Sequence, residues 1–259
     1  MRTTLLMLML AVALPATAED PVARGEALIA EAERRGAGYG DLRAVARMTI
    51  HNGRGSRAIR ELDISILETE DGGSRSLTVV DEPRDVAGTA SLTHTAGDGS
   101  TEQWLYLPAL GRVKRIASSG RSGPFMGSEF TYEDFSAQPP ENYDFRWLRD
   151  ERLDGMDVHV IERRPKPGQS SAYDHQLVWM DTEHLRVHRV EYMSRRGELM
   201  KVLTVRGYEP YGEKYWRAER FVMRNELTGA DTALEWRDIK MGVGLSPRDF
   251  DVNALKAAR

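Results

Sequence analysis

Apolar and polar residues alternate with a period of two along most of the chain. In RELDISILE, for example, Leu62, Ile64 and Ile66 alternate with charged or polar neighbours, which places an apolar and a wet face on one strand. Turn signals such as Asp98-Gly99 separate most of these segments. They predict about 10–12 antiparallel strands, at Arg60–Glu68, Ser76–Val80, Ala90–Thr95, Glu102–Leu107, Arg112–Ala117, Tyr143–Leu148, Val158–Arg164, Tyr173–Asp181, Leu185–Met193, Met200–Tyr208, Arg217–Glu226 and Thr232–Met241.

Two short helices are expected outside this strand pattern. Asp20 can cap a helix that begins at Pro21 and ends at Gly36–Gly40, and Ser246 precedes a second short helix that runs through Leu255. No change of composition marks a domain boundary, so we expect one mainly β domain over residues 19–259. So many strands with short turns favour one curved sheet that closes or nearly closes, because closure removes exposed edges.

The first 18 residues have the pattern of a secretory signal peptide. Arg2 supplies the positive charge, Leu5–Leu14 the apolar region, and Ala16–Ala18 the small residues of a cleavage site after Ala18. We therefore expect an exported, periplasmic protein. The chain has no cysteine, which excludes disulfides and thiolate chemistry. Its formal net charge of −4 argues against nucleic acid as a partner.

No catalytic or metal-binding constellation can be assembled from the sequence. His184 and His188 have helical metal-pair spacing, but on a strand they would lie about 13 Å apart. The adjacent carboxylates Glu133 and Asp134 are interpreted as surface charges, and Arg163 beside a turn as solvated. The prediction is a protein without enzymatic activity, metal or cofactor.

Residues 118–136, SSGRSGPFMGSEFTYEDFS, form what we call the lid segment. Its glycines, serines and arginines suggest a phosphate loop, yet the lysine of that motif is missing and Pro124 interrupts it. Disorder is also disfavoured, because Phe125, Phe130 and Phe135 need apolar contacts. Two interpretations stay open: a mobile flap over an apolar interior, or a loop that plugs one end of the barrel.

A barrel of about ten or more strands can enclose space for a ligand. The expected lining and lid residues of this apolar cavity are aromatic or large and aliphatic: Trp104, Tyr106, Phe125, Met126, Phe130, Phe135, Trp147, Trp179, Leu203 and Trp236. Basic residues at the end of a predicted strand, Arg112, Lys114 and Arg115, are expected at the rim, where they could meet anionic lipid headgroups.

The stretch LYLPALGRVKRI (residues 105–116), followed by GPFMGSEFTYEDF (123–135), resembles the LolA-like outer-membrane lipoprotein-sorting family. The likeness extends to GYGDLRAVARMTI (38–50) and to the strands near Trp236, and is strongest to the branch linked to RND-type exporters. It implies a half-open antiparallel β-barrel around short helices. It also implies an apolar cavity for acyl chains and a periplasmic carrier without catalysis.

The favoured function is a carrier of lipid, or of lipoprotein acyl chains, towards the outer membrane. Acyl chains need an apolar container in water, since each exposed methylene costs about 0.8 kcal/mol. The expected partners are this cargo and an RND-type inner-membrane exporter or an outer-membrane acceptor. The alternative is an adaptor module of such an exporter that binds no ligand of its own.

Overall fold

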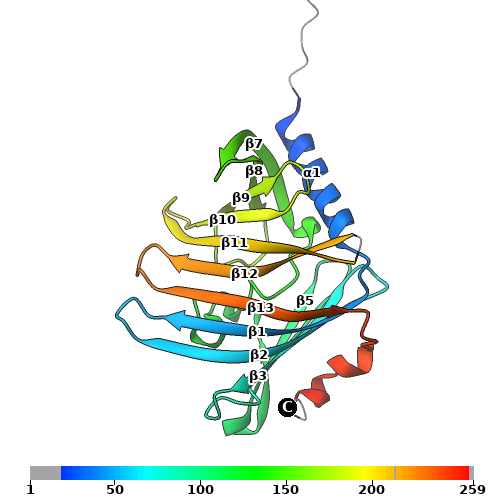
Figure 1. The fold of residues 1–259 in the computed structure, drawn as a ribbon, viewed down its shortest axis with the longest axis vertical. Coiled ribbons are helices and arrows are strands. Elements are labelled where there is room, and N and C mark those ends of the chain that lie inside the picture. The colour runs from blue at the N-terminus through cyan, green and yellow to red at the C-terminus, as the bar shows by residue number, and fades with distance from the viewer. Residues whose placement is uncertain (1–18, 213, 257–259) are drawn as a thin grey trace, which may run out of the picture.

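The computed structural model describes residues 19–212 and 214–256, so the predicted signal peptide lies outside the described residues. One 13-stranded sheet and one long helix, α1 (Pro21–Gly36), dominate the fold (Figure 1). The strands are β1 (Asp41–His51), β2 (Arg57–Glu68), β3 (Ser74–Glu82), β4 (Ala90–Thr95), β5 (Thr101–Leu107), β6 (Arg112–Ile116), β7 (Tyr143–Leu153), β8 (Met156–Pro165), β9 (His175–Asp181), β10 (Val187–Met193), β11 (Leu199–Tyr211), β12 (Tyr215–Asn225) and β13 (Asp231–Met241).

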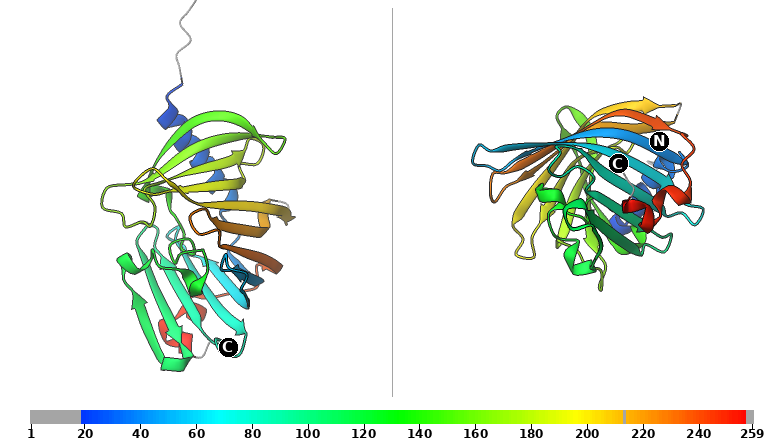
Figure 2. Two further views of the ribbon diagram at one scale, coloured as in Figure 1. Left: turned by 90° about the vertical axis from the view of Figure 1, so that its left-hand side faces the viewer. Right: turned by 90° about the horizontal axis from the view of Figure 1, so that it is seen from below.

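The sheet order is β6-β5-β4-β3-β2-β1-β13-β12-β11-β10-β9-β8-β7. The first strand pairs with the last, β1 with β13, in the middle of the sheet. The edge strands β6 and β7 are consecutive in the chain but lie at opposite ends of the strand order, so the curved sheet stays open on one side (Figure 2). The predicted mainly β, half-open antiparallel barrel is therefore confirmed.

Strand β1 is absent from the predicted strand pattern. Its inward side chains include Ala44 and Ala46, and alanine is a weak strand former with little apolar contrast. Pairing with both β2 and β13 nevertheless gives β1 a central position. Burial between two neighbours thus overrides the weak local signal.

The N-terminal helix forms as predicted, and the C-terminal one differs. The Asp20 side chain accepts a hydrogen bond from the Val22 amide at 3.0 Å, which caps α1. The expected second helix is instead two short 3₁₀ turns, η5 (Pro247–Phe250) and η6 (Val252–Lys256). Within the described residues, no helix has both the length and the apolar character needed to cross a membrane.

The two faces of the sheet are both partly covered. The largest core cluster fills the inner face, where Met48, Leu62 and Met223 meet residues of α1 and of the lid segment. A separate cluster forms where η5 and η6 cover β3 to β6, with Phe250 and Leu255 fully buried. Strand alternation explains this division, since successive side chains point to opposite faces.

Candidate functional site

The aromatic side chains of the lid segment stack inside the curved sheet. The Phe125 and Phe135 rings are nearly parallel with centroids 3.9 Å apart, and Phe130 meets Phe135 edge-on at 5.7 Å. Phe125 is 0% exposed. The same core cluster also contains Met126, Leu203 and Trp236. The structure thus brings these six of the predicted apolar residues together.

Hydrogen bonds hold the lid segment to several strands. Lys201 Nζ on β11 donates to the Glu129 carbonyl oxygen at 2.5 Å, and the Glu129 amide donates to Thr232 Oγ1 on β13 at 3.0 Å. On β5, Gln103 Nε2 donates to the Tyr132 carbonyl oxygen at 2.9 Å. The structure shows the segment docked against the sheet, an arrangement that a plug and a closed flap share, so both interpretations stay predictions.

The interpretation of Glu133 and Asp134 as surface charges is wrong. Glu133 is 7% exposed and accepts a hydrogen bond from Ser171 Oγ at 2.6 Å. Asp134 accepts from the Thr131 amide at 2.7 Å and from the Tyr173 hydroxyl at 3.2 Å. Burial raises the pKa of both carboxyl groups. Adjacent residues can both be buried here because they lie in a turn rather than on a strand.

Two predicted lining residues, Trp104 and Tyr106, do not reach this inner cluster. They pack with Leu92 and Val79 in the cluster that Phe250 covers. The neighbouring Gln103 points inwards instead, as its hydrogen bond to the lid segment requires. The sequence pattern defines two faces, but apolar residues occupy both faces of this part of the sheet, so it does not reveal which face is inside.

Trp147 and Trp179 also lie apart from the inner cluster. The Arg24 guanidinium of α1 lies 4.0 Å above the Trp147 ring, and Trp147 Nε1 donates to Asp150 at 2.8 Å. Trp179 packs against Val158 and Val160 in a small cluster of its own. These two tryptophans anchor α1 and the β8–β9 region respectively.

The predicted basic rim lies on the edge strand β6. Arg112, Lys114 and Arg115 are all exposed there. Arg115 forms an ion pair with Glu102. None of the three lines the groove described next.

Helix α1 crosses the sheet from β7 to β12 and spans the strands between them (Figure 1). Near its N-terminus it lies close to β7, because Gly25 has no side chain there. At its other end, Arg217 of β12 donates to the Gly36 carbonyl oxygen at 3.4 Å. The helix is therefore attached at both ends and leaves space beneath its middle.

That space is a groove of about 980 Å³. Its walls are Ile29, Ala30 and Ala32 of α1 and apolar side chains of the inner sheet face. Those sheet side chains are Tyr143, Phe145, Val178, Met180 and Val187. The turns at residues 72–74 and 95–97 and the segment 137–141 close its far side. The volume lies within the roughly 300–1,000 Å³ typical of small-molecule sites.

None of the predicted site residues lines this groove. The available signal was the pair Tyr143 and Phe145, which Asp144 separates and which therefore marks one apolar face of β7. On β9 the run Leu177–Met180 is apolar throughout, so its sequence does not mark one face. The apolar face becomes a site only because α1 lies above it.

The groove has a charged inner wall. Arg163 lies with its guanidinium 5.0 Å from the centre of the Tyr143 ring and donates to Gln176 Oε1. Its Nε is buried and has no hydrogen-bond partner among the described residues. On α1, Glu33 also lines the groove. Desolvation raises the pKa of its carboxyl group, and the positive charge of Arg163 partly opposes this shift. The expectation that Arg163 is merely solvated is therefore wrong.

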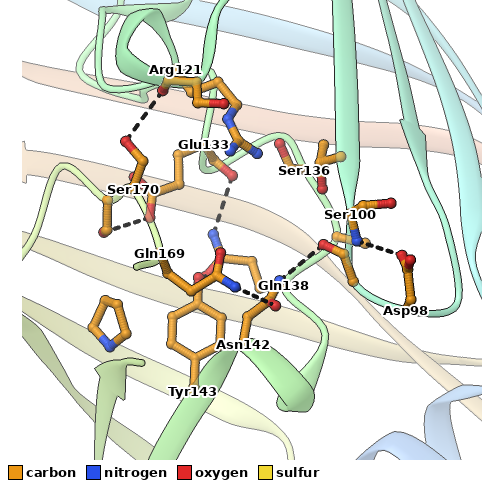
Figure 3. Close-up of a pocket in the computed structure, with 16 residues that line it drawn as sticks. Asp98, Ser100, Arg121, Glu133, Ser136, Gln138, Asn142, Tyr143, Gln169 and Ser170 are labelled. Carbon is orange, nitrogen blue, oxygen red and sulfur yellow. Dashed lines mark hydrogen bonds between the residues drawn. The ribbon is translucent and has the colours of Figure 1, made fainter. Parts of the chain in front are cut away.

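A smaller polar pocket of about 340 Å³ lies where the lid segment meets the β4–β5 and β8–β9 turns (Figure 3). Asn142 Nδ2 donates to the Gly99 carbonyl oxygen at 3.0 Å, and Gln169 Nε2 donates to Asn142 Oδ1 at 2.9 Å. These bonds join both halves of the sheet across its open side. The polar side chains of this pocket are therefore largely hydrogen-bonded to one another, and they connect the two ends of the sheet.

Several solved structures are similar to this chain. An outer membrane lipoprotein-sorting protein domain from Vibrio parahaemolyticus is 44% identical, with a TM-score of 0.88 over 91% of this chain and 99% of the other. A DUF1329 family protein from Desulfovibrio piger is 29% identical, with a TM-score of 0.86 over 91% and 99%. A LolA superfamily protein from Nitrosomonas europaea has the same fold at 18% identity, with a TM-score of 0.69 over 88% and 97%.

Sequence comparisons add a family. A family model described as "Uncharacterized protein" matches residues 72–257. No curated protein matches the chain. The family match and the 44% identity over nearly the whole chain agree with the motifs at residues 105–116 and 123–135, and the chain belongs to the LolA-like outer-membrane lipoprotein-sorting family.

Proposed function

We propose that this protein is a periplasmic carrier that binds lipid, or the acyl chains of a lipoprotein, and transfers it towards the outer membrane. The observation that carries the proposal is the groove of about 980 Å³ between α1 and the apolar inner face of the sheet. Burying about ten methylenes there would be worth roughly 8 kcal/mol. That is enough to hold a chain in water and still release it.

The family supports a carrier rather than an enzyme. The structures similar to this chain in sequence and fold include a lipoprotein-sorting domain. The carboxyl groups of Glu133 and Asp134, which the sequence pattern places on the surface, accept hydrogen bonds from Ser171, Thr131 and Tyr173 within the packed lid region. These hydrogen bonds hold the lid segment together and tie it to the β8–β9 connection.

Displacement of the lid segment would give the carrier a larger binding space. Phe125, Met126, Phe130 and Phe135 occupy the interior beside the groove. Their displacement would expose Leu203 and Trp236 and enlarge the apolar space for cargo with several chains. An RND-type exporter or an outer-membrane acceptor is the partner that would drive such loading or release.

The test is a groove-filling substitution. Ala30 is exposed and lines the groove, so Ala30→Trp fills space without disturbing the core. Ala27→Trp is the matched control, because Ala27 is exposed on the same helix outside the groove. Mass spectrometry of lipids retained by natively purified protein, and titration with a fluorescent fatty acid, give the readouts.

We expect Ala30→Trp to weaken fatty-acid binding about tenfold or more, and Ala27→Trp to leave it unchanged. If the wild-type protein retains no lipid of any class, the carrier proposal is wrong, and an adaptor function without a ligand takes its place.

A further inference from the structure

We propose that the cargo is an amphiphile whose phosphate-bearing headgroup has a net negative charge, held in a cationic pocket at the C-terminal end of α1 while its chain lies in the groove. This inference rests on the proposed function and specifies its ligand class. It follows from a second cavity of about 280 Å³ that adjoins the groove.

The pocket is unusually basic. Six basic side chains line it, and among the described residues no aspartate or glutamate does. They are Arg34, Arg35, His184, Arg186, Lys214 and Arg217. The protein as a whole is acidic, with a formal net charge of −4, so this concentration of positive charge runs against the average surface. A local cationic cavity in an acidic protein is suited to an anionic group.

Two of these cations have no carboxylate partner within the described part of the chain. Arg217 donates only to carbonyl oxygens, those of Trp216 at 3.0 Å and Gly36 at 3.4 Å. Lys214 Nζ donates to the Ala37 carbonyl oxygen at 3.2 Å. By contrast, Arg34 and Arg35 pair with Glu31, and Arg186 pairs with Asp181.

Capping of the helix accounts for only part of this charge. The carbonyl oxygens at the end of α1 carry about half a negative charge in total. Lys214 and Arg217 together supply two positive charges, which exceeds that partial charge, although the carboxylate of Glu68 also acts on Arg217. Burial also lowers the pKa of Arg217, because desolvation disfavours its charged form, and a bound anion would relieve that cost.

Aromatic side chains fix the geometry of the pocket. The Arg186 guanidinium lies 4.5 Å from the centre of the Trp216 ring and 5.4 Å from that of Tyr208. Asp181 accepts from Arg186 Nε at 2.8 Å, which holds the group in that plane. A fixed guanidinium beside two unpaired cations suits the several oxygens of a phosphate better than a single carboxylate.

The pocket and the groove share a wall. Ala32, Gly36, Leu185 and Val187 line both cavities. A headgroup among Arg186, Lys214 and Arg217 therefore places its chain directly on the apolar surface that leads to Phe145 and Met180. The groove wall itself carries Arg163 and Lys166, whereas the exposed cations of β6 lie outside it.

The experiment measures headgroup preference. Purified mature protein is incubated with vesicles of equal phosphatidylglycerol and phosphatidylcholine content and re-isolated, and its bound lipids are quantified by mass spectrometry. We expect wild-type protein to be enriched in phosphatidylglycerol about tenfold. Lys214→Gln combined with Arg217→Gln should abolish the preference while phosphatidylcholine is still retained.

Controls separate charge from folding. Arg112→Gln with Lys114→Gln removes two exposed charges from β6 and should keep the preference. Lys214→Gln alone, at an exposed position, should reduce it even if the double variant is unstable in thermal unfolding. A large excess of inorganic phosphate should leave bound phosphatidylglycerol in place.

Each contrary outcome has a definite meaning. Equal retention of both lipids by wild-type protein overturns the headgroup inference and leaves the carrier function standing. Release of phosphatidylglycerol by inorganic phosphate would identify a free-phosphate site and also overturn it. Retention of neither lipid overturns this inference, and the carrier function falls with it only if natively purified protein also retains no lipid of any class.

Discussion

Gly25 of α1 lies directly against the backbone of Trp147 on β7. A Cβ atom built on Gly25 would lie 2.7 Å from the Trp147 amide nitrogen and 3.0 Å from the Arg146 Cα. Because backbone atoms of a paired strand cannot move aside, any side chain here must push the helix away from the sheet. The position of α1, and with it the shape of the groove, therefore depends on the lack of a side chain at Gly25.

Gly25→Ala should therefore destabilise the protein by about 1–3 kcal/mol through overpacking, although alanine favours helices. Urea denaturation measures the change. Gly36→Ala is the control, because a Cβ there meets no atom within 4 Å, and it should change the stability by less than about 1 kcal/mol. Equal stability of Gly25→Ala and wild type would contradict the close approach of α1 to β7.

Phe125→Ala tests whether the lid segment is a packed plug. Its ring is 0% exposed and stacks on Phe135, so its removal should cost about 3–5 kcal/mol. Leu110→Ala, at a side chain that is 65% exposed, should remain within about 0.5 kcal/mol of wild type. Chemical denaturation distinguishes the two variants. A nearly neutral Phe125→Ala would instead indicate a flap that is only loosely attached.

The buried carboxyl of Asp134 predicts a pH dependence of stability. Burial raises its pKa above the usual 3.8, so the folded protein holds this proton more tightly than the unfolded chain. Its contribution is fully present below pH 3.8 and is lost as the pH rises towards the folded pKa. The stability of wild type relative to Asp134→Asn should therefore fall as the pH rises above about 4.

Asp71 provides a control with the opposite slope. The Thr69 hydroxyl and then the amides of Gly97 and Gly73 lower the pKa of Asp71 to about 2. The advantage of wild type over Asp71→Asn should be present above pH 3.8 and be lost as the pH falls towards 2. Denaturation curves at several pH values give both differences. Parallel pH profiles for wild type and Asp134→Asn would show that Asp134 is not perturbed.

Trp104→Ala separates structural from ligand-binding aromatic residues. The ring lies half-buried in the cluster with Phe250 and outside the groove. We expect a loss of stability of about 2–4 kcal/mol and unchanged lipid retention. The comparison is Ala30→Trp, which should reduce retention with little loss of stability. Reduced retention in folded Trp104→Ala protein would place the ligand near β5 instead.

Local pattern was sufficient for most of the architecture. Period-two alternation and turn residues predicted the antiparallel strands, and Asp20 with Pro21 predicted the start of α1. These signals are short-range, because side-chain direction and capping depend on residues close in sequence. The same pattern did not predict the weakly apolar strand β1, because β1 is stabilised by pairing with its two neighbours, β2 and β13.

The motifs at residues 105–116 and 123–135 determined the family, and the aromatic composition of the lid segment determined that it would be buried. Only the tertiary structure decided which apolar residues face one another. Trp104 and Phe125 are equally apolar in sequence, yet they occupy different clusters, because both faces of the sheet are partly covered. The groove arises from Gly25 and Trp147, which are far apart in the chain and bring α1 onto the sheet. Such a contact has no local signature, and neither does the meeting of Arg186, Lys214 and Arg217 beneath the end of that helix.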